Sequence, residues 1–312
     1  MTTTLETIQQ LFSTLTHPWV FMAISASHIP LTIRTLIRNR DWRGLLLPSA
    51  FCDALFGHFW ATAGPMVKAH AEVRVIPLLE GRVKDGEAHD HVVGLPVSGK
   101  VIEIGAGSGM WADVFCKINT SGNATNDTFR GEGASGVRKR MASSAITKIY
   151  GVEPNPESVR ALRKRVKDIG LDDIYEVVPV GIESLSDPSA FGGEAIEPGS
   201  IDCIVSVLCL CSVPDQKENI EALYKLLKPG GRWYVYEHVK VQRSGLMQTF
   251  LSLYQRFVNV PWSFFIGSCR LCNDTGKHLR EAGSWSAIDL VKPASDPVYQ
   301  LLPHVWGTLT KQ

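Results

Sequence analysis

Residues 100–109 read KVIEIGAGSG, a hydrophobic run that passes directly into a glycine-rich turn. A buried strand followed by closely spaced glycines and then by a helix is typical of a nucleotide-binding turn in an α/β fold. Glycine allows the tight turn and the close approach of a ligand to the backbone. A dinucleotide fingerprint would need a further glycine at position 110, where the chain has Met110. The spacing therefore indicates a nucleotide-like ligand other than a dinucleotide.

Strand-like and helix-like segments alternate on both sides of this turn. Such alternation predicts parallel βαβ units with right-handed crossovers. We therefore predict a doubly wound, Rossmann-like α/β fold with a seven-stranded, mostly parallel sheet and an antiparallel edge hairpin at 284–290 and 305–309. The other expected strands lie at 100–104, 149–152, 175–180, 201–207 and 231–238, and the main helices lie at 110–118, 156–169, 216–227, 244–262 and 275–282.

The chain divides into two parts by pattern. Residues 1–80 show helical periodicity and predict an N-terminal helical lid or membrane-facing segment, whereas residues 81–312 form the α/β domain. Within that domain, residues 119–148 are rich in Ser, Thr, Asn, Gly and Arg and predict a polar surface insertion. The apolar stretches 19–37 and 45–66 are interrupted by polar residues, so they predict amphipathic helices on the site or on a membrane surface, not a spanning helix.

Composition limits the classes of partner and compartment. The 32 basic residues nearly balance the 31 acidic ones, so no global positive field favours nucleic acid. Seven cysteines without a recognisable leader favour reduced thiols. We expect an intracellular protein, cytoplasmic or on the cytoplasmic face of an internal membrane.

Two acidic residues narrow the choice of cofactor. Glu103 lies two residues before the first glycine of the turn, and Glu153 ends the next strand. An ionised carboxylate can accept hydrogen bonds from both ribose hydroxyls, although Glu153 would also suit the N-terminus of the following helix. S-adenosylmethionine carries a ribose and an ammonium group, and no phosphate. The predicted cofactor-binding residues are Glu103, Gly105, Ala106, Gly107, Gly109, Glu153, Pro154, Asn155, Gly181, Ile182, Glu183, Ser206, Val207 and Leu208.

Later motifs are more specific. GSIDCIVSVLCLCSV at 199–213, LLKPGGR at 226–232 and YEHV at 236–239, followed by GSCRL at 267–271 and PHVWG at 303–307, resemble methyltransferase-like family seven, the microsomal thiol S-methyltransferases. The resemblance implies a class I methyltransferase that uses S-adenosyl-L-methionine. It also implies a lipophilic small-molecule acceptor, foremost a thiol, and membrane association through the N-terminal helices.

The acceptor should bind at the carboxyl ends of the parallel strands. His238 is the first candidate for a catalytic base, and Asp215 is the second, although Asp215 would also suit a helix cap. The predicted acceptor residues are Leu208, Cys211, His238, Phe264 and Phe265. Cys269 and Cys272 have a C-x-x-C spacing, but no second pair completes a zinc site, so no metal is expected.

These observations predict methylation of a hydrophobic small molecule, most readily at a thiol sulfur. One alternative is O-, N- or C-methylation of a secondary metabolite. Another is a cofactor-binding protein that does not methylate, either a cyclase or a membrane-associated interaction protein.

Overall fold

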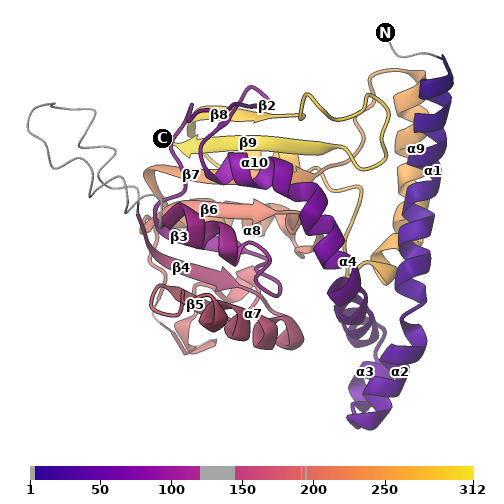
Figure 1. The fold of residues 1–312 in the computed structure, drawn as a ribbon, viewed down its shortest axis with the longest axis horizontal. Coiled ribbons are helices and arrows are strands. Elements are labelled where there is room, and N and C mark those ends of the chain that lie inside the picture. Colours follow the sequence, from indigo (N-terminus) through magenta and orange to yellow (C-terminus); the bar gives the residue numbers. More distant parts are fainter. Residues whose placement is uncertain (1–3, 120–144, 191, 194) are drawn as a thin grey trace, which may run out of the picture.

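A single seven-stranded sheet organises the protein, shown in Figure 1 as a computed structural model that describes residues 4–119, 145–190, 192–193 and 195–312. The strand order is β5-β4-β3-β6-β7-β9-β8. The first five strands in this order run parallel, and β9 pairs antiparallel with both β7 and β8. The predicted mostly parallel sheet with an antiparallel edge hairpin is thus confirmed. The strands are β3 (Gly99–Ile104), β4 (Ile146–Val152), β5 (Tyr175–Val178), β6 (Ile201–Val207), β7 (Leu227–His238), β8 (Trp285–Val291) and β9 (His304–Lys311).

The central strands are buried because helices cover both faces of the sheet. β3 ends in four consecutive buried residues, as expected for a parallel strand in the middle of a doubly wound sheet. Two apolar clusters lie on the two faces, one around Val101 and Phe115, the other around Ile102 and Trp233. The covering helices include one over residues 112–119, α7 (Pro156–Asp168), α8 (Gln216–Leu226) and α10 (Thr275–Glu281).

Two strands begin three or more residues earlier than predicted. β4 begins at Ile146, so residues 146–148 belong to the sheet and not to the predicted polar insertion. The start of this strand alternates between buried and exposed positions, which leaves no apolar run for a sequence pattern to detect. β7 begins at Leu227 and runs through Pro229 and Gly230, whereas the predicted strand began at residue 231. Residues 120–144 of the predicted insertion lie outside the described residues.

Helices cover the carboxyl ends of the parallel strands. They are α1 (Thr4–Ala26), α2 (Ile29–Arg38), α3 (Trp42–Leu46), α4 (Pro48–Leu79) and α9 (Leu246–Phe265). In Figure 1, α1 and α9 lie side by side and α4 runs between them and the sheet. Ser25 Oγ donates to the Phe265 carbonyl at 2.6 Å, and Trp19 Nε1 donates to the Tyr254 hydroxyl at 2.6 Å. The predicted N-terminal helices are present. The cover also includes α9, a helix that the sequence assigned to the α/β domain.

The remaining elements are short. A small antiparallel ribbon, β1 (Val83–Lys84) with β2 (Glu87–Ala88), follows α4. Three single 3-10 turns follow strands or loops: η1 (Ile182–Ser184), η2 (Pro188–Ala190) and η3 (Leu210–Ser212). A third apolar cluster, which includes Phe59, Val258 and Trp262, joins the cover helices to one another. The cover is therefore a packed layer.

The N-terminal segment is more apolar than its polar interruptions suggested. Leu5–Arg38 is long and apolar enough, by length and composition alone, to cross a membrane, and 22% of its most hydrophobic window is buried. The helix breaks at residues 27–28, between α1 and α2.

Candidate cofactor and acceptor site

The glycine-rich turn follows β3 with its glycines in the left-handed region, at φ 64° for Gly105, 56° for Gly107 and 82° for Gly109. A methyl group on Gly105 would lie 2.5 Å from Cys209 Cβ, and one on Gly109 would lie 3.0 Å from a Leu162 methyl carbon. At Gly107 the nearest atom would be 3.9 Å away. Packing therefore excludes a side chain at 105 and crowds one at 109, whereas position 107 leaves open space that a ligand can fill.

Glu153 lies against this turn, as the spacing predicted. Its Oε2 accepts a hydrogen bond from the Gly107 amide at 2.9 Å, and its Oε1 accepts one from the Asn155 amide at 2.9 Å. Burial raises the pKa of Glu153, and the two amide bonds oppose that rise. Asn155 also caps α7, because its side-chain oxygen accepts from the amides of Glu157 and Ser158. The carboxylate is thus fixed beside the open position of the turn.

Glu103 is the second acid of the site. Its side chain is buried, and Oε2 accepts a hydrogen bond from the Tyr175 hydroxyl. Oε1 has no hydrogen-bond partner among the described residues. Burial raises the pKa of Glu103 to about 8, and the nearby charge of Glu153 adds to the rise. A buried carboxylate oxygen without a partner is costly, and a ligand cation would relieve that cost.

The open position at Gly107, the fixed carboxylate of Glu153 and the unpaired oxygen of Glu103 suit a ligand with hydroxyl groups and a cation. S-adenosylmethionine has both. Tyr175, which holds Glu103, was not predicted as a site residue. It lies on β5, 72 residues from Glu103, and only the sheet brings the two together.

The other predicted cofactor residues differ in how deeply they are buried and in whether their polar groups are already hydrogen-bonded. Ser206 is fully buried, and its Oγ accepts a hydrogen bond from Trp233 Nε1 at 3.0 Å, so its side chain is engaged in the core. Ile182 packs into the second core cluster. Pro154 and Glu183 are exposed, and Gly181, Val207 and Leu208 are half-buried. Ala106 is buried, and its amide donates to the Val152 carbonyl at 3.1 Å.

The loop after β6 is strained and is held by a residue outside the predicted set. Leu208 has φ 52°, an uncommon value for a residue other than glycine. The fully buried carboxylate of Glu237 accepts from the amides of Cys209 at 3.1 Å and Leu210 at 3.2 Å. Burial raises the pKa of Glu237 to about 7, and these amide bonds oppose the rise. Strain that is held by surrounding contacts is frequent at functional sites.

A cavity of about 740 Å³ lies between this loop and the cover helices. Leu208, Cys211 and His238, three of the residues that the sequence suggested for the acceptor, line this cavity. Its largely apolar walls include Phe21, Ile24, Phe56, Trp60, Trp262 and Ile266. The cavity adjoins the glycine-rich turn, because Cys209, which contacts Gly105, directly follows Leu208.

Three predictions for this region are corrected. Phe264 and Phe265 are not among the residues that line the cavity: Phe264 stacks on Phe51, and Phe265 packs into the cover. Trp262 and Ile266, one helical turn apart, face the cavity instead. Asp215 is exposed with φ 40°, makes no side-chain cap to α8, and lies outside the cavity wall.

His238 lies in a buried group with two cysteines. Its Nε2 is 3.2 Å from Cys269 Sγ, and the ligand atoms of Cys211, His238 and Cys269 lie within 4.8 Å of one another. Burial would lower the pKa of His238, but Cys211 and the charge of Glu237 outweigh burial and raise it. Cys272 is not part of this group.

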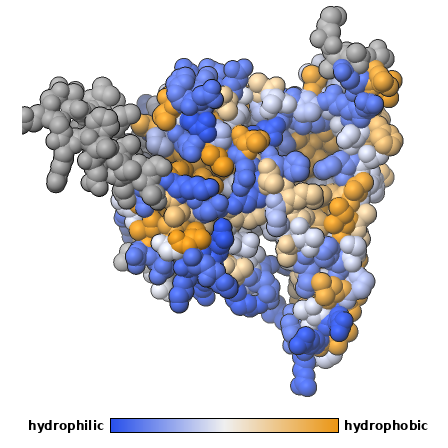
Figure 2. Space-filling model, in the orientation of Figure 1, coloured by the Kyte–Doolittle hydropathy of each residue, from blue (hydrophilic) through white to orange (hydrophobic). Residues whose placement is uncertain are grey.

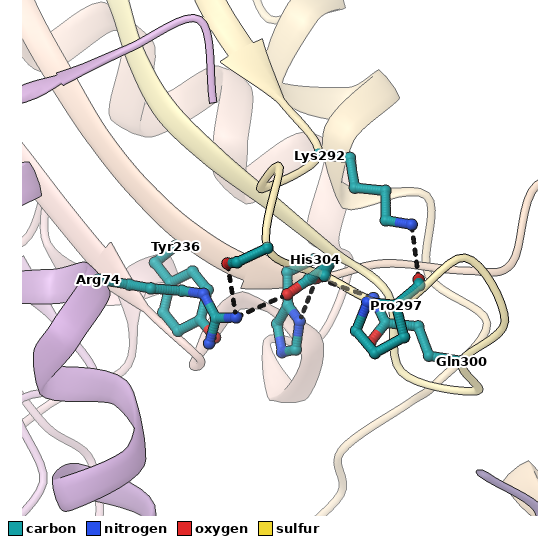
Figure 3. A network of polar contacts seen from close by, with 8 residues as sticks. Arg74, Tyr236, Lys292, Pro297, Gln300 and His304 are labelled. Carbon is teal, nitrogen blue, oxygen red and sulfur yellow. Dashed lines mark hydrogen bonds and ion pairs between the residues drawn. The ribbon is translucent and has the colours of Figure 1, made fainter. Parts of the chain in front are cut away.

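A polar network beside His238 also lines the cavity, since Arg74, Tyr236, Gln300 and His304 belong to its wall (Figure 3). Arg74 on α4 contacts Asp296 Oδ1 at 2.8 Å and lies over the ring of Tyr236. Asp296 Oδ2 also contacts His304 Nδ1 at 3.1 Å. Burial lowers the pKa of His304. Burial would raise the pKa of Asp296, but the hydrogen bonds that it accepts from His304 and Gln300, together with the charge of Arg74, outweigh burial and lower that pKa. The network joins the loop before β9 to the cover.

Together, the fold and the two acids at the turn define a nucleotide-binding α/β protein of the class I methyltransferase type. The family described as a methyltransferase domain matches residues 87–273, and the chain belongs to that family. S-adenosyl-L-methionine is the cofactor that this family implies.

Similar proteins agree with this assignment. The chain is 26% identical to the human thiol S-methyltransferase TMT1A over 161 residues, which covers 51% of this chain and 61% of that protein. It is 24% identical to the rat thiol S-methyltransferase TMT1B over 168 residues, 53% of this chain and 62% of that protein. The chain thus spans about three fifths of these relatives. The predicted resemblance to thiol S-methyltransferases is confirmed.

A solved structure supports the fold alone. The CurJ carbon methyltransferase superimposes with a TM-score of 0.50 at 15% identity, covering 97% of this chain and 69% of that one. This agreement confirms the Rossmann-like methyltransferase architecture.

Proposed function

We propose that the protein transfers a methyl group from S-adenosylmethionine to a thiol sulfur of a hydrophobic small molecule. The observation that carries the proposal is the largely apolar cavity of about 740 Å³ beside the glycine-rich turn, with Cys211 and His238 in its wall. Its size suits a small organic molecule, and its lining favours an apolar one. The relatives named thiol S-methyltransferases support sulfur as the accepting atom.

The residues around the two sites have distinct roles in this proposal. Glu153 receives the ribose hydroxyls and Glu103 pairs with the ammonium group of the cofactor, whose sulfonium supplies an electrophilic methyl group when bound. Methyl transfer is an in-line displacement, so alignment and exclusion of water are the main contributions of the protein. Leu208 borders both sites, and its strained backbone fixes the border between the methyl donor and the acceptor.

The test is release of S-adenosylhomocysteine from the purified protein, offered hydrophobic thiols beside phenols and amines of matched shape. We expect turnover on the thiols. Trp60→Ala, in the cavity wall, should raise KM for bulky thiols, whereas Phe264→Ala, outside the wall, should leave KM unchanged. Turnover confined to oxygen, nitrogen or carbon acceptors would favour methylation of another kind of metabolite. Cofactor binding without turnover on any acceptor would overturn the proposal.

We also propose that the cover rests on the cytoplasmic face of an internal membrane. Large apolar side chains are exposed along neighbouring helices: Leu5, Ile8 and Phe12 on α1, and Leu253, Phe257 and Val260 on α9. Figure 2 shows hydrophobic residues reaching the surface along this helical side of the molecule. Arg34 and Arg38 of α2 are also exposed, and basic residues beside an apolar face favour anionic lipid headgroups.

Co-sedimentation with lipid vesicles tests this membrane contact. We expect binding to vesicles that contain anionic lipid, and weaker binding to neutral ones. The double variant Leu253→Asp and Phe257→Asp should reduce binding, whereas Ile288→Asp, an exposed apolar position on β8, should not. Equal binding of both variants would contradict a membrane face built on α9.

A further inference from the structure

The buried group of Cys211, His238 and Cys269 has the composition of a metal site. Its three ligand atoms lie within 4.8 Å of one another, and all three residues are buried. Each comes from a different segment: η3, the end of β7 and the loop after α9. Thiolate and imidazole are the ligands that Zn²⁺ prefers in proteins.

The surrounding backbone holds these ligands in place without a metal. The carbonyl of Cys211 accepts hydrogen bonds from the Arg270 amide at 3.1 Å and from Asn273 Nδ2 at 3.2 Å. The loop that carries Cys269 is therefore tied to the turn that carries Cys211. His238 is fixed separately by the pairing of β7 with β9. Its Nδ1 is buried without a hydrogen-bond partner in the part of the chain that the structure describes.

We propose that Cys211, His238 and Cys269 bind one Zn²⁺ ion with an open fourth position that faces the acceptor cavity. All three residues line that cavity. Structural zinc sites close their coordination with four protein ligands, whereas catalytic sites keep three and leave a position for water or substrate. Two cysteines and one histidine at a cavity wall match the second arrangement.

This inference rests on the proposed thiol methylation and deepens it. The acceptor thiol would take the open position and lose its proton to solvent, since a coordinating thiol is deprotonated. A sulfur lone pair then attacks the methyl carbon, the bond from that carbon to the sulfonium sulfur breaks, and its electron pair returns to that sulfur. The products are a methyl thioether and S-adenosylhomocysteine. The neutral thioether is a weaker ligand than the thiolate and leaves.

A Zn²⁺ ion in this position would also account for a preference for sulfur acceptors. Two protein thiolates balance the charge of Zn²⁺, so a third thiolate makes the site negative and attracts the positive sulfonium. Thiolates bind Zn²⁺ more readily than neutral amines or phenols in a site of this kind. The metal would therefore select sulfur over oxygen and nitrogen among acceptors of the same shape.

The experiment measures metal binding directly on the full chain. After chelation, the protein is titrated with Co²⁺, which reports thiolate ligation and tetrahedral geometry through its charge-transfer and d–d absorption bands. We expect one equivalent with both signatures, displaced by one equivalent of Zn²⁺. Cys269→Ser and Cys211→Ser should weaken Zn²⁺ binding by more than about 100-fold, beyond the typical effect of losing an outer-shell contact. Cys272→Ser is the matched control and should bind as the wild type does.

A second measurement avoids variants that fail to fold. In the wild-type protein, Zn²⁺ should slow alkylation of Cys211 and Cys269, read by mass spectrometry, and leave Cys272 unaffected. A hydrophobic thiol added to the Co²⁺ protein should shift the charge-transfer band, and a matched phenol should not.

The outcomes separate this inference from the proposed function. A folded protein without Co²⁺ bands, or with a Cys211–Cys269 disulfide in their place, overturns the metal site. Thiol turnover by that metal-free protein would leave methyl transfer standing, with His238 as the candidate base. A bound metal without turnover on any acceptor would overturn the proposed function and leave the metal site intact.

Discussion

The carboxylate of Glu153 accepts a hydrogen bond at 2.9 Å from the amide of Gly107, a residue 46 positions earlier in the chain. This bond joins the ends of β3 and β4, which are neighbours in the sheet. It places a fixed acceptor directly beside the open position of the glycine-rich turn.

Glu153→Ala should weaken S-adenosylmethionine binding, because the ribose loses its charged acceptor. The expected loss is about 1–3 kcal/mol, or roughly 5- to 150-fold in Kd. Isothermal titration calorimetry measures it, and Glu157→Ala, an exposed acid on the first turn of α7, is the matched control. An unchanged Kd in a folded Glu153→Ala protein would remove Glu153 from this role.

Glu103→Gln should change how stability depends on pH. Burial raises the pKa of Glu103 to about 8 in the folded protein, from an ordinary value of 4.5. The contribution of the neutral acid to stability is therefore complete below pH 4.5 and is lost as the pH rises to about 8. The variant lacks this loss, so its stability relative to the wild type should improve over that range by on the order of a few kcal/mol.

Urea unfolding at several pH values measures this effect, with Glu183→Gln at an exposed position as the control. Parallel pH profiles for the wild type and Glu103→Gln would show that Glu103 is ionised in the fold at neutral pH.

Asp296→Asn should destabilise the protein at pH 7, since the Arg74 guanidinium loses its anionic partner. Arg74 is partly exposed, so the expected loss is about 1–3 kcal/mol, below the range for a fully buried pair. The pKa of Asp296 is lowered from 3.8, so its contribution is present above pH 3.8 and disappears as the pH falls through the lower folded value. Thermal unfolding at pH 7 and pH 3 should show a gap between the two proteins that is smaller in acid, and a gap of constant size would argue against the ion pair.

Gly107→Ala and Gly109→Ala should separate cofactor binding from folding. Both residues have positive φ, so each alanine costs about 1–2 kcal/mol of backbone strain. Only at Gly109 does the new methyl also press on Leu162 and Arg165, so that variant should unfold at the lower temperature. Gly107→Ala fills the open position and should lose the greater part of its cofactor affinity. Calorimetry and thermal scans on both proteins test this, and stronger binding by Gly107→Ala than by Gly109→Ala would contradict the assignment.

The sheet was predictable from sequence because its signals are local. The hydrophobic run before Gly105 and the alternation of strand-like and helix-like segments after it predict parallel strands. The observed ends of β6 and α7 fall within one residue of the predicted ones. The position of Glu153 beside the glycine-rich turn was predictable, because an acid that ends the strand next to that turn lies close to it.

The acceptor cavity was only partly predictable because its walls come from distant segments. Leu208 and Cys211 follow β6, and His238 ends β7; both strands were predicted from the sequence. Cys269 joins His238 from 31 residues away, whereas the C-x-x-C spacing had paired Cys269 with Cys272. Phe264 and Trp262 lie two residues apart on α9, and only the packing of that helix against α1 and α4 decides which one faces the cavity.

The position of β9 has a consequence for synthesis on the ribosome. β9 lies between β7 and β8 in the sheet but follows both in the chain (Figure 1). A nascent chain that has exposed β7 and β8 therefore has two strand edges with no partner to join them, and such edges invite pairing with other chains. His304, which completes the polar wall of the cavity, arrives with β9. The acceptor cavity should thus form late in biogenesis, and chaperone protection would be needed longest at this edge.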